Sequence, residues 1–309
     1  MRITSKNLQR TYLRGLNSNI KKLSDSNERL NTGRRFSKLS QNVIDGSRAL
    51  NVRDLLARNE TFVGNAQQMQ LQLSSQEEKM MQIQTLVQDA QELMTRGYSD
   101  TNSADDKLII GNQMNSIKES IMQIINSKSV DRYTFASLSN EKPISVVGSD
   151  VFFYGQNVDE NDGSVFNKGQ FKVSVGNMID IGQPAIDVLG HGVDANGISN
   201  NLIKLLDQIS TSISTSDKTH QGTFVNKMND KANELLMRIS DIGMKTNYLE
   251  ATLSRLSDEK ISLTTQQNNL EAIDFEEEVI FNKSHEMAWQ ISLQLGTKVL
   301  PMSIFDFMR

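Results

Sequence analysis

Apolar residues recur every seven positions along two long stretches of the chain. The first stretch, residues 43–96, carries two interleaved series in which eleven of 13 positions are apolar, Asn59 and Gln76 being the exceptions. A seven-residue repeat is typical of an α-helix packed along its length against another helix. It predicts a helix of about 80 Å at 1.5 Å per residue, which ends where Gly97 begins a run of turn residues.

The second stretch covers residues 222–270, where one series of seven positions is apolar throughout. The two helices have nearly the same length, so we expect them to pack side by side within one chain. An extended coiled coil between several chains is the alternative. The expected rod core is Leu55, Phe62, Met69, Leu73, Met80, Val87, Leu235, Ile242, Leu249, Leu256 and Leu263.

The region between the long helices has two patterns. Ser103 with Asp106 has the spacing of a helix N-cap, and the stripe Ile110, Met114, Ile117, Ile121 and Ile124 predicts a helix that completes a hairpin. Residues 140–198 instead hold nine of the 18 glycines and short runs with the two-residue period of strands. We expect a small antiparallel β domain there that can be removed without unfolding the helices.

Both ends of the chain carry shorter amphipathic segments, and a lone helix of this length is marginal in water. We therefore expect each segment to pack against the other and against copies from neighbouring subunits. The candidate assembly residues are Leu8, Tyr12, Leu16, Ile20, Leu23, Leu30, Ile280, Met287, Trp289, Ile291, Leu295, Phe305 and Phe307.

The predicted fold is mainly α: an elongated helical bundle or coiled-coil rod with an inserted small β-rich domain and amphipathic helical terminal arms. Its expected parts are an N-terminal arm (1–40), the first half of the rod (41–139), the β-rich insert (140–198), the second half of the rod (199–272) and a C-terminal arm (273–309).

Composition narrows the function classes. Thirty-three Lys and Arg against 37 Asp and Glu leave a net charge of −4, which gives no basic footprint for nucleic acid. Without cysteine there is no disulfide framework and no thiolate metal site. We expect no secretory signal peptide, because residues 1–10 are polar, and no membrane insertion, because no apolar run reaches 18 residues.

Candidate chemistry is sparse, so neither an enzyme nor a cofactor is expected. His191, His220 and His285 are scattered and have no second ligand at metal spacing. The acidic pair at residues 105–106 and the acidic triplet at residues 276–278 fall at expected helix starts, where acidic side chains interact favourably with the helix dipole. The Ser/Thr run at 209–217 is interpreted as a helix end and linker, modification of its hydroxyls being the alternative.

A family resemblance adds to this picture. The segment Arg29-Leu30-Asn31-Thr32-Gly33-Arg34-Arg35-Phe36, followed by Asp45-Gly46-Ser47-Arg48-Ala49-Leu50, resembles the turn and second helix of bacterial flagellins and their hook-associated relatives. The segment from Ile273 to the end is similar to their C-terminal signature. The opening Met1-Arg2-Ile3-Thr4, the run Arg132-Tyr133-Thr134-Phe135-Ala136 and the last residues resemble the hook–filament junction branch of the family. One segment departs from it, because Ser40-Gln41-Asn42-Val43 lacks the family's paired acids.

The resemblance implies a structural subunit of the extracellular bacterial flagellum, exported unfolded through the flagellar channel after a cytosolic chaperone has bound its C-terminal arm. It would join hook to filament as a ring of copies, between a neighbouring hook-associated protein and the filament-side subunits. A filament flagellin is the alternative in the same class. A cytoplasmic coiled-coil adaptor or signalling protein is the alternative from another class.

Overall fold

A computed structural model describes residues 2–129, 132–136, 141–148, 150–160, 170–174, 176–180 and 183–299. The chain divides into two compact units. The first comprises Met1–Arg58 with Asp258–Arg309, and the second comprises Asn59–Ser257. Two long helices, α2 and α6, contribute to both units.

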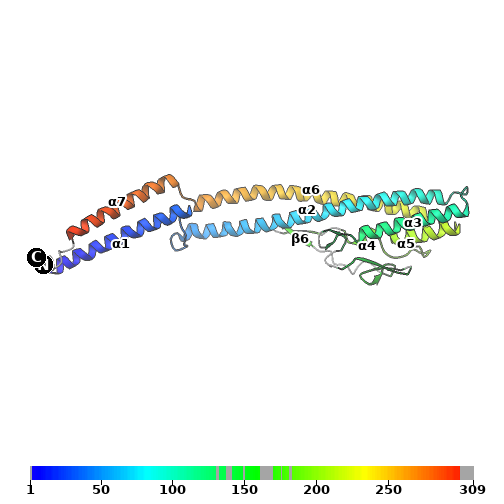
Figure 1. Cartoon of the computed structure of the whole chain (residues 1–309), viewed down its shortest axis with the longest axis horizontal. Helices are drawn as coiled ribbons and strands as arrows, with labels where there is room; N and C mark the ends of the chain where they lie inside the picture. Colours follow the sequence, from blue (N-terminus) through cyan, green and yellow to red (C-terminus); the bar gives the residue numbers. More distant parts are fainter. Residues whose placement is uncertain are drawn as a thin grey trace. The chain divides into compact units, whose positions relative to one another are not determined.

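Helices account for most of the described chain (Figure 1). They are α1 (Arg2–Thr32), α2 (Val43–Gly97), α3 (Ala104–Ile125), α4 (Ala185–Leu189), α5 (Leu202–Thr215), α6 (Gln221–Glu271) and α7 (Phe275–Val299). The two long helices match the predicted stretches to within one residue at each end. The hydroxyl of Ser103 accepts a hydrogen bond from the amide of Asp106, whose carboxylate accepts one from the Ser103 amide, so the predicted capping box begins α3.

In the second unit, α2 and α6 pack antiparallel along the predicted seam. The side-chain amide of Asn59 donates a 3.0 Å hydrogen bond to the carbonyl of Leu256. The side-chain amide of Gln91 donates a 2.8 Å hydrogen bond to Oδ1 of Asn229. These two contacts pair residues early in one helix with residues late in the other. The buried members of the expected rod core are Met69, Leu73, Met80, Val87, Leu235, Ile242, Leu249, Leu256 and Leu263.

Two expected core residues differ from this pattern. Leu55 is 46% exposed and Phe62 is half-buried, although both belong to a seven-residue series. In the turn around Leu55, in the first unit, it is Val52 of the other series that is buried. From Met69 onwards both series are enclosed, because other elements of the second unit join the same hydrophobic core.

The short helices α3 and α5 pack closely because small residues meet at their contact. The hydroxyl of Ser210 donates a 2.9 Å hydrogen bond to the carbonyl of Gly111. A Cβ on Gly111 would lie 2.2 Å from Oγ of Ser214 and 3.2 Å from the carbonyl oxygen of Ser210. The Ser/Thr run therefore belongs to α5 and ends it at Thr215, which agrees with the helix-end interpretation.

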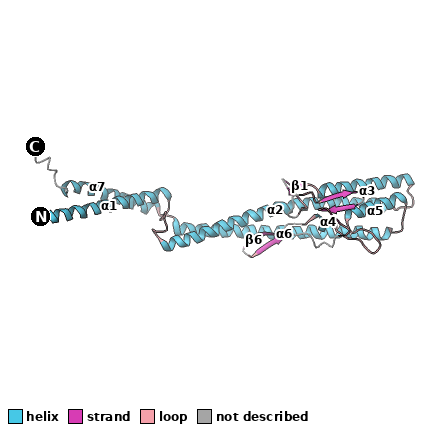
Figure 2. Ribbon diagram, turned by 90° about the horizontal axis from the view of Figure 1, so that it is seen from below, coloured by secondary structure: helices cyan, strands magenta, loops and turns pink. Residues whose placement is uncertain are grey.

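Within the described residues, the strands form three separate small antiparallel sheets. They are β1 (Lys128–Ser129) with β2 (Arg132–Tyr133), β3 (Ile144–Val147) with β4 (Asp150–Phe153) and β5 (Gln156–Asn157), and β6 (Gln170–Ser174) with β7 (Asn177–Asp180). Figure 2 shows the strands lying against the helices. The two-residue turn between β4 and β5 has positive φ at both Tyr154 (47°) and Gly155 (80°), as a type I′ hairpin turn requires.

The apolar side chains of these strands share a core with the helices. An isolated two-stranded hairpin is marginally stable at best in water, and packing against a helix stabilises such small sheets. Ile144, Phe153 and Val158 belong to the same buried cluster as Met69 and Leu73 of α2. The side chain of Gln76, the polar exception in the seam of α2, donates a 2.7 Å hydrogen bond to the carbonyl of Thr134 and accepts a 3.1 Å bond from the amide of Gln183.

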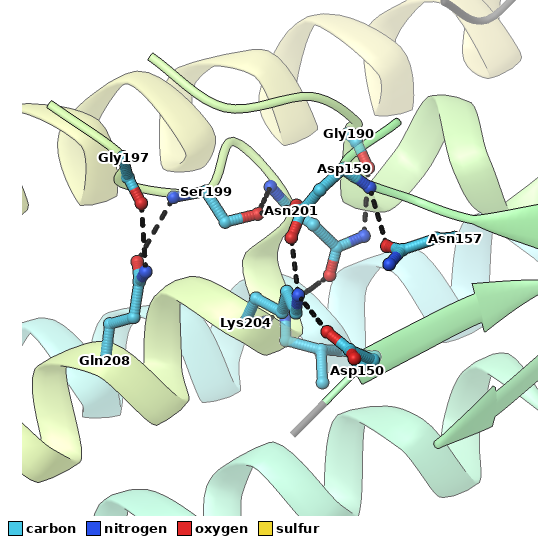
Figure 3. Close-up of polar contacts among 10 residues, drawn as sticks. Asp150, Asn157, Asp159, Gly190, Gly197, Ser199, Asn201, Lys204 and Gln208 are labelled. Carbon is cyan, nitrogen blue, oxygen red and sulfur yellow. Dashed lines mark hydrogen bonds and ion pairs between the residues drawn. The ribbon is translucent and has the colours of Figure 1, made fainter. Parts of the chain in front are cut away.

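A polar cluster fastens the start of α5 to the strands (Figure 3). Nζ of Lys204 lies 2.8 Å from Oδ1 of Asp150 and 2.5 Å from Oδ2 of Asp159. Ser199 donates a 2.7 Å hydrogen bond to the other oxygen of Asp159. Burial lowers the pKa of Lys204, but the bonds to the two carboxylates outweigh it, so the pKa of this amine is raised. Lys204 is therefore charged at neutral pH and crosslinks β4 and the segment after β5 to α5.

Candidate assembly surface

The terminal helices α1 and α7 lie side by side in the first unit, as Figures 1 and 2 both show, and polar groups of the two helices meet at their contact. The hydroxyl of Tyr12 donates a 2.9 Å hydrogen bond to the carbonyl of Ser292, and Asn19 donates a 2.7 Å bond to the Ser292 hydroxyl. Gly296 makes room for Tyr12, since a Cβ there would lie 2.2 Å from the phenol oxygen. The expected pairing of the two arms is therefore present within one chain.

A buried carboxylate holds the other end of this helix pair. Oε1 of Glu278 accepts a 2.6 Å hydrogen bond from the Ser26 hydroxyl and lies 2.9 Å from the guanidinium of Arg29. Burial raises the pKa of Glu278, but the bonds from Ser26 and Arg29 outweigh it, so the pKa lies below its usual range. Asn282, one turn further, donates hydrogen bonds to Ser26 and Asn27. The negative charge on Glu278 is thus part of the α1–α7 contact.

The corner that follows α1 contacts the end of α6 within the first unit. Gly33 has φ of 67°, the left-handed conformation that ends many helices, which accounts for the glycine in the resemblance motif. The amide of Arg35 donates a 2.7 Å hydrogen bond to the carbonyl of Glu271, and the amide of Ile273 donates one to the carbonyl of Gly33. The buried carboxylate of Glu271 lies 2.7 Å from Arg53. These bonds fix the direction in which the chain enters α7.

The start of α7 is capped by the residue that precedes it. Oδ1 of Asp274 accepts hydrogen bonds from the amides of Glu276 (3.0 Å) and Glu277 (3.2 Å). The three glutamates at 276–278 occupy the first turn, where they favour the helix dipole. The structure therefore gives this acidic cluster the helix-start role that the sequence predicts.

An apolar stripe runs along α7 on the side away from α1. The contacts with α1 described above place Glu278, Asn282, Ser292 and Gly296 on one face of α7. At 3.6 residues per turn, positions 280, 287, 291 and 295 point in the opposite direction. All four are exposed, between 50 and 69%. We call this set the outer stripe: Ile280, Met287, Ile291 and Leu295.

The other candidate assembly residues fall into three groups. Tyr12, Leu16, Leu23, Leu30 and Trp289 are half-buried. Leu8 and Ile20 are exposed. Phe305 and Phe307 lie outside the described residues.

Sequence reasoning missed a further set of exposed apolar residues in the first unit. Leu39, Val43, Ile44 and Leu50 are 47 to 69% exposed around the start of α2, and Phe281 is exposed on α7. The sequence signal that could have revealed them is the pair Val43-Ile44, two adjacent apolar residues on the outer face of a helix start. Together with the outer stripe, these residues are exposed apolar side chains of the first unit.

Within the described residues, no set of three or more His, Asp and Glu side chains is arranged to hold a metal ion. His220 makes an edge contact with Phe224, and His285 is half-buried on α7. A hollow of about 360 Å³ beside the corner is lined by charged residues of both signs, including Arg34, Arg35 and Glu28. Among the residues that the structure describes, no helix is long and apolar enough to cross a membrane.

Comparison with known proteins gives a consistent result. Residues 3–136 match the model of the bacterial flagellin N-terminal helical region. Over its full length the chain is 22% identical to flagellar hook-associated protein 3 of Escherichia coli, with 99% of each chain covered, and 22% identical to the protein of the same name from Salmonella typhimurium, with all of each chain covered.

The fold is similar to that of solved structures from the same group. The flagellar junction protein FlgL from Legionella pneumophila superposes with a TM-score of 0.57 at 9% identity, covering 73% of this chain and all of that chain. The helical architecture, the matched N-terminal region and the full-length relatives agree, and the chain is similar to bacterial flagellins and their hook-associated relatives.

Proposed function

We propose that this chain is a structural subunit of the bacterial flagellum that joins hook to filament as a hook-associated junction protein. Two relatives that match it from end to end are named flagellar hook-associated protein 3, and one protein of similar fold is named a flagellar junction protein. In this role the chain acts outside the cell, after export, and performs no catalysis.

The observation that carries the proposal is the outer stripe of α7. Ile280, Met287, Ile291 and Leu295 are at least half exposed, although α7 already contacts α1 through its other side. Each such side chain gains about 1 to 2 kcal/mol when it is removed from water. A second partner for α7 is therefore favoured, and in a ring of subunits that partner is the terminal helices of neighbouring copies.

The same stripe supports two further partners. Before export, exposed apolar side chains on α7 would be covered in the cytosol by an export chaperone that binds the C-terminal arm. After assembly, neighbouring hook-associated and filament-side subunits would contact the ring from its two sides. Both roles follow from the resemblance to the flagellin family and from the exposure of α7.

The test is the double change Ile291→Asp with Leu295→Asp in cells that carry no other copy. Two charges would have to be desolvated at the interface without a partner, which costs several kcal/mol. We expect the variant to be secreted, hooks to form, and flagellin to be released into the medium because filaments are not held. Secretion is measured alongside, because a chaperone would use the same stripe.

The matched control is Met237→Asp with Met244→Asp, which places two charges at exposed positions of α6 in the second unit and should leave filaments attached. Normal filaments on cells that secrete the Ile291→Asp, Leu295→Asp variant would contradict the proposed role of α7.

The abundance of the chain in isolated flagella distinguishes the proposed function from the alternative in the same class. A ring subunit is a minor component of isolated flagella, whereas a filament flagellin is their bulk protein. Presence outside the cell excludes the cytoplasmic adaptor.

A further inference from the structure

We propose that the corner around the start of α2 in one copy binds the first two turns of α7 in a second copy. The corner patch consists of Leu39, Val43, Ile44 and Leu50 with the basic residues Arg35, Lys38 and Arg48. The α7 patch consists of Glu276, Glu277, Ile280 and Phe281. The inference rests on the proposed function and adds to it the pair of surfaces through which copies join.

The corner patch is an apolar surface on an otherwise polar helix start. Val43 and Ile44 are 69 and 68% exposed, and Leu50 follows Val43 two turns later on the same side of α2. Leu39 in the preceding loop lies against this helix, because a Cβ on Gly46 would meet its Cδ2 at 2.8 Å. Contiguous exposed apolar groups of this kind mark interaction sites in soluble proteins.

The α7 patch has the complementary composition. Residues 276 and 280 are four apart, as are 277 and 281, so the two glutamates lie one turn before the two apolar residues on one face of α7. Ile280 is 69% and Phe281 47% exposed. This face is separate from the one that contacts α1, which carries Glu278 and Asn282.

Charge complementarity selects a second copy as the partner. Residues 34–48 contain four basic residues and one acidic residue, whereas residues 274–281 contain four acidic residues and no basic one. Glu278 is used within the chain by Arg29. In the described part of the chain, Arg35, Lys38, Glu276 and Glu277 have no ion-pair partner within 4 Å. Opposite charges on two exposed apolar patches steer such surfaces together.

The two patches cannot satisfy each other within one chain in this conformation, because both remain exposed in the folded first unit. The contact is therefore heterologous: the corner of one copy receives α7 of the next, whose corner is free to receive another. Repeated contacts of this type generate rings or helical assemblies rather than isolated dimers.

Disulfide trapping tests the contact, because the chain has no cysteine of its own. In the variant Val43→Cys with Ile280→Cys, the two thiols are the only ones in the protein. Flagella are isolated from cells in which this variant is the sole copy, oxidised mildly, and analysed without reductant. We expect a ladder of dimers, trimers and higher multimers. Each single-cysteine variant should give no ladder.

The control replaces Ile280→Cys by Leu293→Cys, a residue with 46% exposure on another face of α7, and should give no ladder. The inference is overturned if the trapping variant is incorporated and cells swim normally, yet its thiols form no multimers, close within one chain or link to a different protein. Absence of the unmodified chain from isolated flagella would instead contradict the proposed function.

Charge reversal decides the matter if the cysteine variant is not incorporated. Arg35→Glu with Lys38→Glu should lower the amount of the chain retained in flagella about tenfold, since like charges across an interface repel. Glu276→Lys with Glu277→Lys should do the same, and the four changes together should restore retention. Normal secretion of all three variants without restoration in the combined one overturns the inference.

Discussion

The hydroxyl of Ser26 donates a 2.6 Å hydrogen bond to Oε1 of Glu278 between α1 and α7. Polar groups of both helices meet at this contact, on the same face of α1 as the half-buried Leu16, Leu23 and Leu30. The outer stripe of α7 stays exposed. A surface helix of a protein that functions alone carries polar residues on its solvent side, so the outer stripe is suited to burial inside an assembly.

The α1–α7 contact should weaken in acid. The pKa of Glu278 is lowered in the folded chain, so its contribution to stability is complete above the pKa of the unfolded carboxyl, about 4.3, and is lost as pH falls through the lower folded value. Trp289, the single tryptophan, lies half-buried on α7. Its emission in the purified chain should shift to longer wavelength below about pH 4.

Glu278→Gln removes the charge from this contact and should abolish that acid transition, whereas Glu277→Gln, which alters an exposed carboxylate, should retain it. Asp25, Glu28 and His285 also lie on the two helices, and the Glu277→Gln control carries all three unchanged. Identical acid profiles for the wild-type chain and the Glu278→Gln variant would show that Glu278 does not hold the helices together.

Leu256→Asp should strongly destabilise the second unit. Leu256 is 1% exposed in the seam between α2 and α6, and a carboxylate there would be buried without a partner, at a cost of several kcal/mol. Chemical denaturation followed by circular dichroism measures the loss. Met244→Asp on the exposed side of the same helix should change the free energy of unfolding by no more than about 0.5 kcal/mol, and equal effects of the two changes would contradict the buried seam.

Gly111→Ala should disturb the close contact of α3 and α5. The added methyl group would lie 2.2 Å from Oγ of Ser214, so Ser214 must give up its hydrogen bond to the carbonyl of Ser210. We expect a loss of about 1 kcal/mol and recovery in the double variant Gly111→Ala with Ser214→Ala. Gly64→Ala is the control, because nothing lies within 4 Å of that position and alanine favours the helix.

Thermal unfolding monitored by calorimetry distinguishes these three variants. A melting temperature for Gly111→Ala as high as that of Gly64→Ala would mean that α3 and α5 are not in close contact.

Gln76→Leu tests the attachment of the strand region to α2. Leucine restores the seven-residue apolar pattern but leaves the carbonyl of Thr134 and the amide of Gln183 without their buried partner. We expect the variant to lose about 2 kcal/mol of stability. Gln70→Leu removes only an exposed 3.4 Å contact with Glu250 and should be neutral. A stabilised Gln76→Leu variant would indicate that the insert is separable after all, which hydrogen exchange of residues 132–136 can confirm independently.

The sequence by itself determined the long helices of this protein, but not α4, which lies within the segment 140–198 that was predicted to be β-rich. Seven-residue spacing placed α2 and α6 to within one residue at each end, and the spacing of Ser103 and Asp106 placed the start of α3. These features depend on residues that are neighbours along one helix, so their physical causes are present in the sequence. The family motifs at the two ends also lie in short continuous segments.

Only the tertiary structure decided which faces of those helices find partners. Spacing alone treats Val52 and Leu55 alike, yet one is buried and the other exposed, because burial depends on what lies opposite. Glycine content predicted a separable insert, and only the structure shows that Phe153 of the insert shares a buried cluster with the helices. The partner of Glu278 is 252 positions away at Ser26, and no local pattern encodes a contact between groups so distant in the chain.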